Sequence, residues 1–291
     1  MASSYKLKGH GSFGIREGWL NKGLRCIKND ALVFRDKKAA DMLGVGSNMA
    51  QSIRYWLKAF KLMEETTKDG AKLTKLGQII EKEDPYFEDI FTLWILHYNL
   101  VTHYEMATSW NLLFNKCDVD DYSREELFFE LDNQLKMELG NDEYPVNSLK
   151  DDILVLTNMY SKNKSVDSDP EENTVSPFVQ LGLISERKHK YSKVQPNLNL
   201  INDEVVLYII IKKLRELNYT TSISIDTLYE ESNGLGKVLN LSRVAINQYL
   251  DRLENKGYLR VNRTAGLDMV YLEENITAFD VIQSYYVNAK G

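Results

Sequence analysis

The sequence is poor in the residues that build disulfide bonds and metal sites. Two of its 291 residues are cysteine and four are histidine. Cys26 and Cys117 lie far apart, so the sequence predicts neither a disulfide framework nor a CxxC site, and a reducing cytoplasm is the expected location. His97 and His103 fall on different faces of a helix, and no two histidines have the i, i+4 spacing of a zinc-binding helix. We therefore expect no metal and no cofactor.

Long apolar runs are also absent. No run approaches the ~20 residues that a membrane-spanning helix needs. Residues 1–8 lack the apolar core of a signal peptide. Hydrophobic residues make up 43% of the chain and charged residues 27%, which is ordinary for a soluble globular protein. We expect two or three soluble domains and no membrane partner.

Catalytic motifs are missing as well. No GxSxG sequence marks a nucleophile elbow, and neither cysteine lies in a context typical of a nucleophile. The glycine-rich residues 10–24 match neither GxxxxGK[ST] nor GxGxxG. A nuclease site of dispersed Asp, Glu and Lys stays open, because such sites assemble from distant segments. We expect no enzymatic activity and assign no catalytic residue.

Charge is distributed unevenly, although the net charge is −6. Residues 1–82 carry 16 Lys/Arg and 8 Asp/Glu, residues 83–175 carry 6 and 21, and residues 176–291 carry 14 and 13. Beyond a Debye length of ~8 Å charges are largely screened, so a basic region can attract phosphates despite a distant acidic one. The pattern predicts a basic N-terminal winged-helix-like domain (1–82), an acidic helical domain ending in a polar loop (83–175) and a C-terminal winged-helix domain (176–291).

A first helix-turn-helix unit is predicted from residue 36 to about residue 80. Asp36 is a suitable N-cap for a short helix, Gly44 can take the left-handed conformation of a tight turn, and Ser47 caps the second helix. A two-stranded wing is expected around residues 66–70. The outer face of the second helix is expected to reach base edges and phosphates through Asn48, Gln51, Ser52, Arg54, Tyr55 and Lys58.

A second unit, from about residue 225 to residue 272, has the clearer pattern. Ser242 caps a helix whose buried stripe contains Ile246, Leu250 and Leu253, and two strands follow. Residues 253–259 resemble the junction of recognition helix and wing in many bacterial winged-helix regulators. The residues expected to face a DNA groove or to lie on the wing are Arg243, Asn247, Gln248, Arg252, Arg260 and Arg263. Either unit has a second interpretation, as a module for packing or protein interaction.

The acidic region between the two units is mostly helical in pattern. Helices are expected over residues 86–100, 104–114, 125–139 and 149–160, with a polar loop over 161–173. Its carboxylates are expected to form a solvated face; docking of a basic partner and mimicry of DNA charge are the alternatives. Further along, a basic hairpin tip offers Arg187 and Lys188 to phosphates, or is an exposed turn with incidental charges.

The N-terminal stretch GHGSFGIREGWLNKGL is expected to form a loop packed on the first helical unit, with Arg16 available to a phosphate. With the neighbouring helix-turn-helix and the later strip ENTVSPFVQLGLI, it resembles an uncharacterised bacterial family, the domain of unknown function 4007. The resemblance covers most of the chain and transfers no catalytic residue. It implies an accessory role beside sulfurtransferase-type enzymes of DNA phosphorothioate modification and phage defence, with DNA and other system components as partners.

The sequence as a whole predicts a mainly α-helical cytoplasmic protein with two winged helix-turn-helix-like domains flanking an acidic helical core. Its expected function is non-catalytic binding of double-stranded DNA, as an accessory or regulatory component of a bacterial DNA modification or defence system. A protein–protein scaffold is the first alternative and a DNA-processing nuclease is the second. The expected partners are double-stranded DNA and protein components of such a system, and a homodimer stays open.

Overall fold

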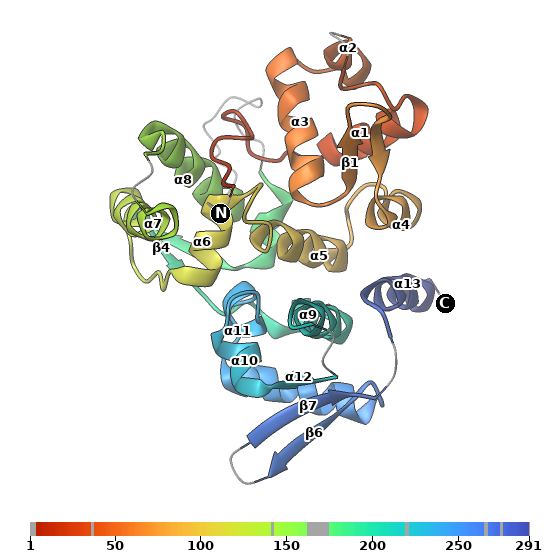
Figure 1. Ribbon diagram of the computed structural model, residues 1–291, viewed down its shortest axis with the longest axis vertical. Helices are drawn as coiled ribbons and strands as arrows, with labels where there is room; N and C mark the ends of the chain where they lie inside the picture. The colour runs from red at the N-terminus through yellow and green to blue at the C-terminus, as the bar shows by residue number, and fades with distance from the viewer. Residues whose placement is uncertain are drawn as a thin grey trace. The chain divides into compact units, whose positions relative to one another are not determined.

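Helices form where apolar residues recur at spacings of three and four, and they dominate the fold (Figure 1). The computed structural model describes residues 4–35, 38–140, 143–161, 175–218, 221–264, 267–273 and 276–290. Small antiparallel sheets complete the fold. The predicted mainly α class is therefore confirmed. Among the described residues, no helix is both long and apolar enough to cross a membrane.

The chain divides into two compact units, Met1–Lys193 and Val194–Gly291. The first unit contains, in order, α1 (Trp19–Asn29), α2 (Ala39–Leu43), α3 (Ser47–Ala59), β1 (Met63–Thr66), β2 (Gly70–Leu73), α4 (Lys75–Glu83), α5 (Ile90–Val101), α6 (Thr108–Lys116), α7 (Arg124–Leu139), α8 (Val146–Ser161), the 3-10 helix η1 (Pro177–Leu181), β3 (Ile184–Arg187) and β4 (Lys190–Lys193). The second unit contains the 3-10 helix η2 (Leu198–Leu200), α9 (Asp203–Glu216), β5 (Ser222–Ser224), α10 (Ile225–Glu230), α11 (Leu235–Val238), α12 (Arg243–Asn255), β6 (Leu259–Thr264), β7 (Leu267–Leu272) and α13 (Ala278–Ala289).

Helix α5 is the centre of the first unit. Every residue from Phe91 to Val101 is buried, as expected for a helix that is apolar on all sides. Helix α6 and η1 pack on α5, and α7 lies beside α8. The expected helices of the acidic region are all present, with ends that differ by a few residues.

The hairpin of β3 and β4 belongs to the first unit. The backbone of Tyr191 exchanges hydrogen bonds with that of Tyr122, ahead of α7. The Lys193 ammonium donates to the carbonyls of Leu113, Phe114 and Cys117 at 3.3, 3.1 and 2.8 Å. A lysine there satisfies carbonyls that the end of α6 leaves open. Residues 176–193 therefore group by packing with the helices before them, whereas the predicted boundary at residue 175 placed them with the C-terminal domain.

The second unit is built on α9, whose residues from Val205 to Ile211 are all buried. Helix α13 packs on α9, and α12 packs on both α9 and β6. The strands form an antiparallel sheet in the order β5-β7-β6, in which Val261 and Val270 are paired. From α9 to β7 the chain forms a helix, a strand, three helices and two further strands. The last of these strands, β7, lies in the middle of the sheet.

Several expected features of the two helix-turn-helix units are confirmed locally. Gly44 ends α2 with φ of 64°, β1 pairs with β2, and the Ser242 side chain accepts a hydrogen bond from Ala245 N–H at the start of α12. Helix α3 begins at Ser47, one residue earlier than expected, because Gly46 and not Ser47 is its N-cap. The predicted cap Asp36 and most of the polar loop, residues 162–173, lie outside the described residues.

Candidate nucleic-acid interface

Helix α12 presents an exposed polar face over its first half. Ile246, Leu250 and Leu253 are fully buried, as their spacing predicts. On the other side, Arg243 and Gln248 are exposed and Asn247 is half-buried. Polar side chains on the N-terminal half of such a helix are the ones that can reach base edges in a major groove.

Val244 is a further exposed residue on this face. Its side chain is apolar, and 69% of the residue is accessible to solvent. It lies next to Arg243 and one helical turn before Gln248. Val244 was not among the predicted contacts, because those were chosen for their polarity. Its position opposite the buried stripe through Ile246 was nevertheless sufficient to predict its exposure.

The two arginines nearest this face have aspartate partners. Arg243 pairs with Asp226 and lies 3.9 Å from Asp268. Arg263, on β6, donates to Asp251 at 2.6 Å and to the amide oxygen of Asn247 at 3.2 Å. These pairs tie β6 and the segment at the start of α10 to the helix face.

The remaining predicted cations of the second unit, Arg252 and Arg260, are also paired, and so is Lys256, which was not predicted. Arg252 and Lys256 bind Asp203 at 2.7 and 2.9 Å, at the start of α9. Arg260 lies 3.3 Å from Glu273. Burial opposes the charge of Lys256, but its carboxylate partners outweigh burial, so the pKa of Lys256 lies above its ordinary value. Arg252 and Lys256 therefore hold α12 to α9.

Helix α3 is covered over part of the side that was expected to be open. Ser52 and Tyr55 are buried, at 1% and 6% exposure. The Ser52 hydroxyl donates to the Phe13 carbonyl and the Tyr55 hydroxyl to the Met106 carbonyl. The prediction that Ser52 and Tyr55 face solvent is wrong, because their polar tips have partners inside the protein.

Arg54 and Lys58 are tied to a single carboxylate. Glu65 of β1 lies 2.7 Å from Arg54 and 2.5 Å from Lys58. Burial disfavours the charged form of Glu65, but hydrogen bonds from Lys58 and Arg54 outweigh it, so its pKa lies below the ordinary value. The exposed polar residues that remain of the predicted α3 face are Asn48 and Gln51.

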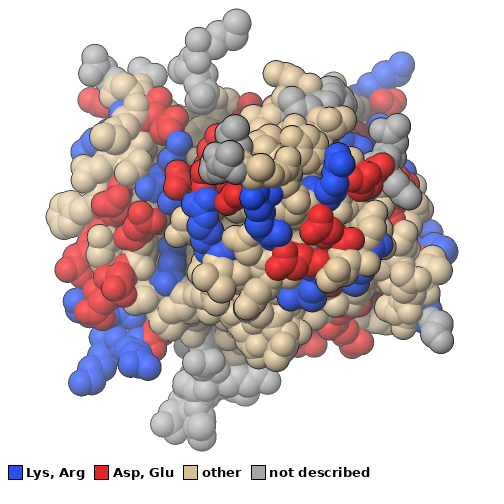
Figure 2. Space-filling view, turned by 90° about the horizontal axis from the view of Figure 1, so that it is seen from below, with Lys and Arg blue, Asp and Glu red and all other residues tan. Residues whose placement is uncertain are grey.

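The other predicted phosphate contacts, Arg16, Arg187 and Lys188, belong to the first unit. Arg16 is half-buried, with its guanidinium 5.4 Å from the centre of the Trp19 ring. Arg187 and Lys188 are exposed, and the register of β3 and β4 confirms the predicted hairpin tip. On the face that Figure 2 presents, Lys and Arg side chains (blue) lie intermixed with Asp and Glu side chains (red).

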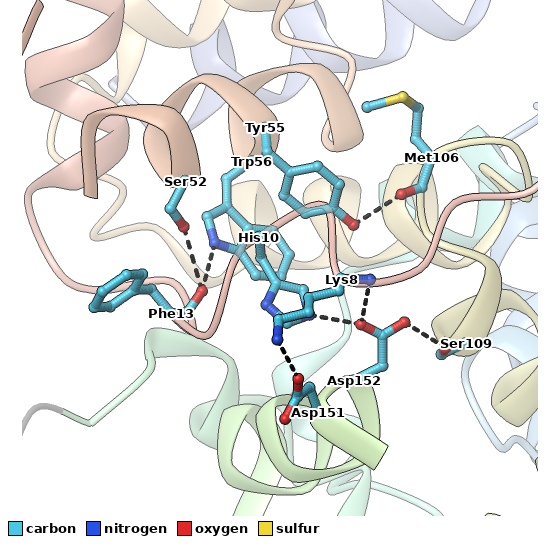
Figure 3. A network of polar contacts seen from close by, with 10 residues as sticks. All are labelled: Lys8, His10, Phe13, Ser52, Tyr55, Trp56, Met106, Ser109, Asp151 and Asp152. Carbon is cyan, nitrogen blue, oxygen red and sulfur yellow. Dashed lines mark hydrogen bonds and ion pairs between the residues drawn. The ribbon is translucent and has the colours of Figure 1, made fainter. Parts of the chain in front are cut away.

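A buried polar network holds the N-terminal segment against α3, α6 and α8 (Figure 3). Asp152 accepts from His10 Nε2 at 2.8 Å, from the Lys8 backbone N–H at 2.8 Å and from the Ser109 hydroxyl at 2.6 Å. The His10 ring is stacked on Trp56, with centroids 5.7 Å apart.

Although the network contains Ser, His and Asp, its connectivity differs from that of a hydrolase triad. Ser109 bonds to Asp152 and not to His10, so the imidazole is not placed to remove the serine proton. His10, Ser109 and Asp152 are at most 1% exposed. The network therefore anchors residues 8–13. The prediction of a packed N-terminal loop agrees with this for residues 8–13, but it is wrong for residues 19–24, which belong to α1.

The sequence model of a family described as "Protein of unknown function (DUF4007)" matches residues 7–286, nearly the whole chain. The chain belongs to this family. It is also similar to a crystal structure of SspB and to a crystal structure of magnesium-ion-bound SspB, with TM-scores of 0.83 and 0.84. Both similarities are at 22% sequence identity and cover 99% of this chain and 89% of the other. They show a shared fold. No curated protein sequence matches the chain.

No metal site is evident in the described part of this DUF4007 chain. Within those ranges, no group of three or more His, Cys, Asp and Glu is arranged to hold an ion. The magnesium ion is a feature of the SspB structure.

Proposed function

We propose that this DUF4007 protein binds double-stranded DNA through the α12 face of its second unit, without catalysing a reaction. The observation that carries the proposal is the open first half of α12, where Arg243, Val244 and Gln248 are exposed together. Arginine and glutamine can make paired hydrogen bonds to guanine and adenine, and an apolar side chain can contact the thymine methyl group.

The topology of the second unit supports this proposal. Helices α10 to α12, followed by β6 and β7 beside β5, have the element order of a winged helix-turn-helix, with α12 as its recognition helix and the β6–β7 hairpin as its wing. In that arrangement the recognition helix enters the major groove and the wing approaches the backbone. Arg263 of the wing would contact a phosphate.

The aspartate partners of the arginines make binding weak and strongly dependent on salt. Asp226 and Asp251 are more than half exposed, and exposed ion pairs contribute about 0–1 kcal/mol. A phosphate, which forms charge-assisted hydrogen bonds with arginine, can therefore replace them. Residues 194–291 contain 10 Lys/Arg and 12 Asp/Glu, so no excess of positive charge assists this exchange.

An accessory or regulatory role in DNA modification or phage defence is the cellular context we propose. It rests on the family resemblance, and the proposed DNA contact is consistent with it. Protein components of such a system would then be partners alongside DNA.

Replacing Gln248 by glutamate is expected to weaken DNA binding roughly tenfold, because the carboxylate would face base edges and phosphates. Binding is measured by fluorescence anisotropy of a labelled duplex at low salt. The matched control is Gln283→Glu, the same exchange at an exposed position of α13. Equal affinities of the two variants would contradict the assignment of α12, and absence of binding by the unaltered protein would contradict the proposed function.

A protein–protein scaffold is the second candidate. The pairing of every predicted cation of α12 and the wing with a carboxylate favours it, because a polar surface with balanced charge suits a protein partner as well as a polyanion. Failure of the unaltered chain to bind DNA would favour the scaffold. Plasmid cleavage that requires magnesium would instead favour the nuclease that the sequence left open.

A further inference from the structure

A cavity of about 330 Å³ opens between α7 and α8 of the first unit. Helix α7 contributes Arg124, Glu125, Phe128 and Phe129 to its lining, and α8 contributes Lys150 and Ile153. The two helices lie side by side in Figure 1, and residues of both are in contact. The cavity belongs to the first unit, and the α12 face belongs to the second.

The cavity presents an aromatic surface to solvent. Phe129 is 64% exposed, and its ring lies edge-on to that of Phe128 with centroids 5.7 Å apart. Leu154 of α8 is 44% exposed. Exposed aromatic side chains beside a pocket are typical of surfaces that receive an apolar side chain of a partner protein.

The two cations of the lining already have partners. Arg124 donates to Thr157 at 3.0 Å and to Asn158 at 2.8 Å. The Lys150 ammonium lies 5.3 Å from the centre of the Phe128 ring. Neither group therefore marks the cavity as an anion site.

Glu125 of the lining belongs to an acidic segment that leads into α7. Asp120, Asp121, Glu125 and Glu126 are all exposed within the seven residues that end at Glu126. Lys190 offsets part of this charge, at 3.2 Å from Asp121 and 3.9 Å from Glu126. Arg124, Lys150 and Lys190 stand against the four carboxylates, so a small excess of negative charge is left, and it favours a cationic ligand over the phosphates of a nucleic acid.

We propose that the α7–α8 cavity docks a basic segment of a partner protein, which inserts a leucine or aromatic side chain against Phe128 and Phe129. Lysine or arginine residues of the same segment then face the carboxylates of residues 120–126. The apolar insertion supplies affinity and the charges supply orientation and rate of association. This proposal does not depend on DNA binding by α12.

The test uses the full chain and a labelled amphipathic helical peptide with leucine and tryptophan on one face and lysine on the other. A second peptide carries glutamate in place of each lysine. Fluorescence anisotropy is expected to show saturable binding of the lysine peptide that weakens with salt, and at least tenfold weaker binding of the glutamate peptide. Absence of saturable binding by the lysine peptide, or equal binding of both peptides, would overturn the proposal.

Variants locate the binding surface. Phe129→Ala is expected to weaken binding of the lysine peptide at least about tenfold, as loss of an interface anchor does. Tyr86→Ala is the control, because Tyr86 is an aromatic residue of the same unit with similar exposure, 62%. Asp120→Asn combined with Glu125→Gln is expected to reduce the salt dependence.

Three results with these variants would contradict the proposal. Equal affinities of Phe129→Ala and Tyr86→Ala would remove the binding from the cavity. Dissociation of a homodimer by Phe129→Ala, seen by analytical ultracentrifugation, would assign the surface to a second copy of the chain. Loss of single-stranded oligonucleotide binding in Phe129→Ala would assign it to nucleic acid.

Discussion

Replacing Asp152 by alanine is expected to lower the free energy of unfolding of the first unit by ~3–5 kcal/mol, because several buried donors lose their acceptor at once. The carboxylate is 1% exposed and accepts hydrogen bonds from the Lys8 backbone, His10 and Ser109. Alanine leaves all three donors inside the protein without this acceptor, and each buried donor left unsatisfied costs about 1–3 kcal/mol. The N-terminal segment would lose its attachment to α8.

Denaturant unfolding followed by tryptophan fluorescence measures this effect. All four tryptophans belong to the first unit, so the signal reports on that unit. Asp151→Ala is the matched control, because the neighbouring carboxylate is 35% exposed and pairs with the Lys8 ammonium at 2.6 Å. An exposed pair of this kind contributes about 0–1 kcal/mol. Similar losses for the two variants would show that the buried network does not stabilise the unit.

Replacing Trp56 by alanine is expected to be about as damaging, with a loss of ~3–5 kcal/mol for a buried aromatic side chain. Trp56 is fully buried, its indole N–H donates to the Phe13 carbonyl at 3.1 Å, and its ring stacks on His10 and Phe60. Alanine would leave a cavity where α3, α6 and the N-terminal segment meet. The Phe13 carbonyl would also lose the hydrogen bond from the indole N–H.

The comparison with Trp56→Phe separates these contributions. Phenylalanine keeps an aromatic ring but cannot donate the hydrogen bond, so its loss is expected to fall well below that of alanine. Thermal unfolding followed by circular dichroism compares the two variants without relying on the tryptophan removed. Equal losses would indicate that the hydrogen bond, rather than packing, carries the contribution of Trp56.

The sequence was most informative where a helix has one buried stripe and a visible cap. Ser242 and the Ile246–Leu250–Leu253 spacing fixed both the start and the buried side of α12. Local signals of this kind need no knowledge of distant residues. Most helices of the acidic region followed from periodicity for the same reason.

The face of α3 was not predictable in the same way. Ser52 and Tyr55 are polar, so their spacing places them outside; in the fold their hydroxyls reach the carbonyls of Phe13 and Met106. Tyrosine combines an apolar ring with a polar tip and is often buried with a partner. Only tertiary structure shows that residues 8–13 cover this side of the helix.

The ion pairs of the candidate interface also required the structure. Glu65, the partner of Arg54, lies on the strand after α3. Asp226 precedes Arg243 in the sequence and Asp268 follows it, so neither partner is a neighbour along the chain. A count of charges along the chain identifies a basic region but not which cations have carboxylate partners. Charge counting alone favours the basic N-terminal region as the main phosphate contact, whereas the exposed face of α12 makes the second unit the better candidate.

The salt dependence of DNA affinity tests the central claim most directly. The quantity compared is the slope of the logarithm of affinity against the logarithm of salt concentration. It is measured for the unaltered chain, for the α12 pair (Arg243→Gln combined with Arg263→Gln) and for the α3 set (Arg54→Gln, Lys58→Gln and Glu65→Gln combined). The last set neutralises the α3 cluster without leaving Glu65 as an unpaired charge. Each lost phosphate contact lowers the slope by about 0.9. We predict a slope roughly 1–2 lower for the α12 pair and an unchanged slope for the α3 set. An unchanged slope for the α12 pair, with a lower one for the α3 set, would contradict the account.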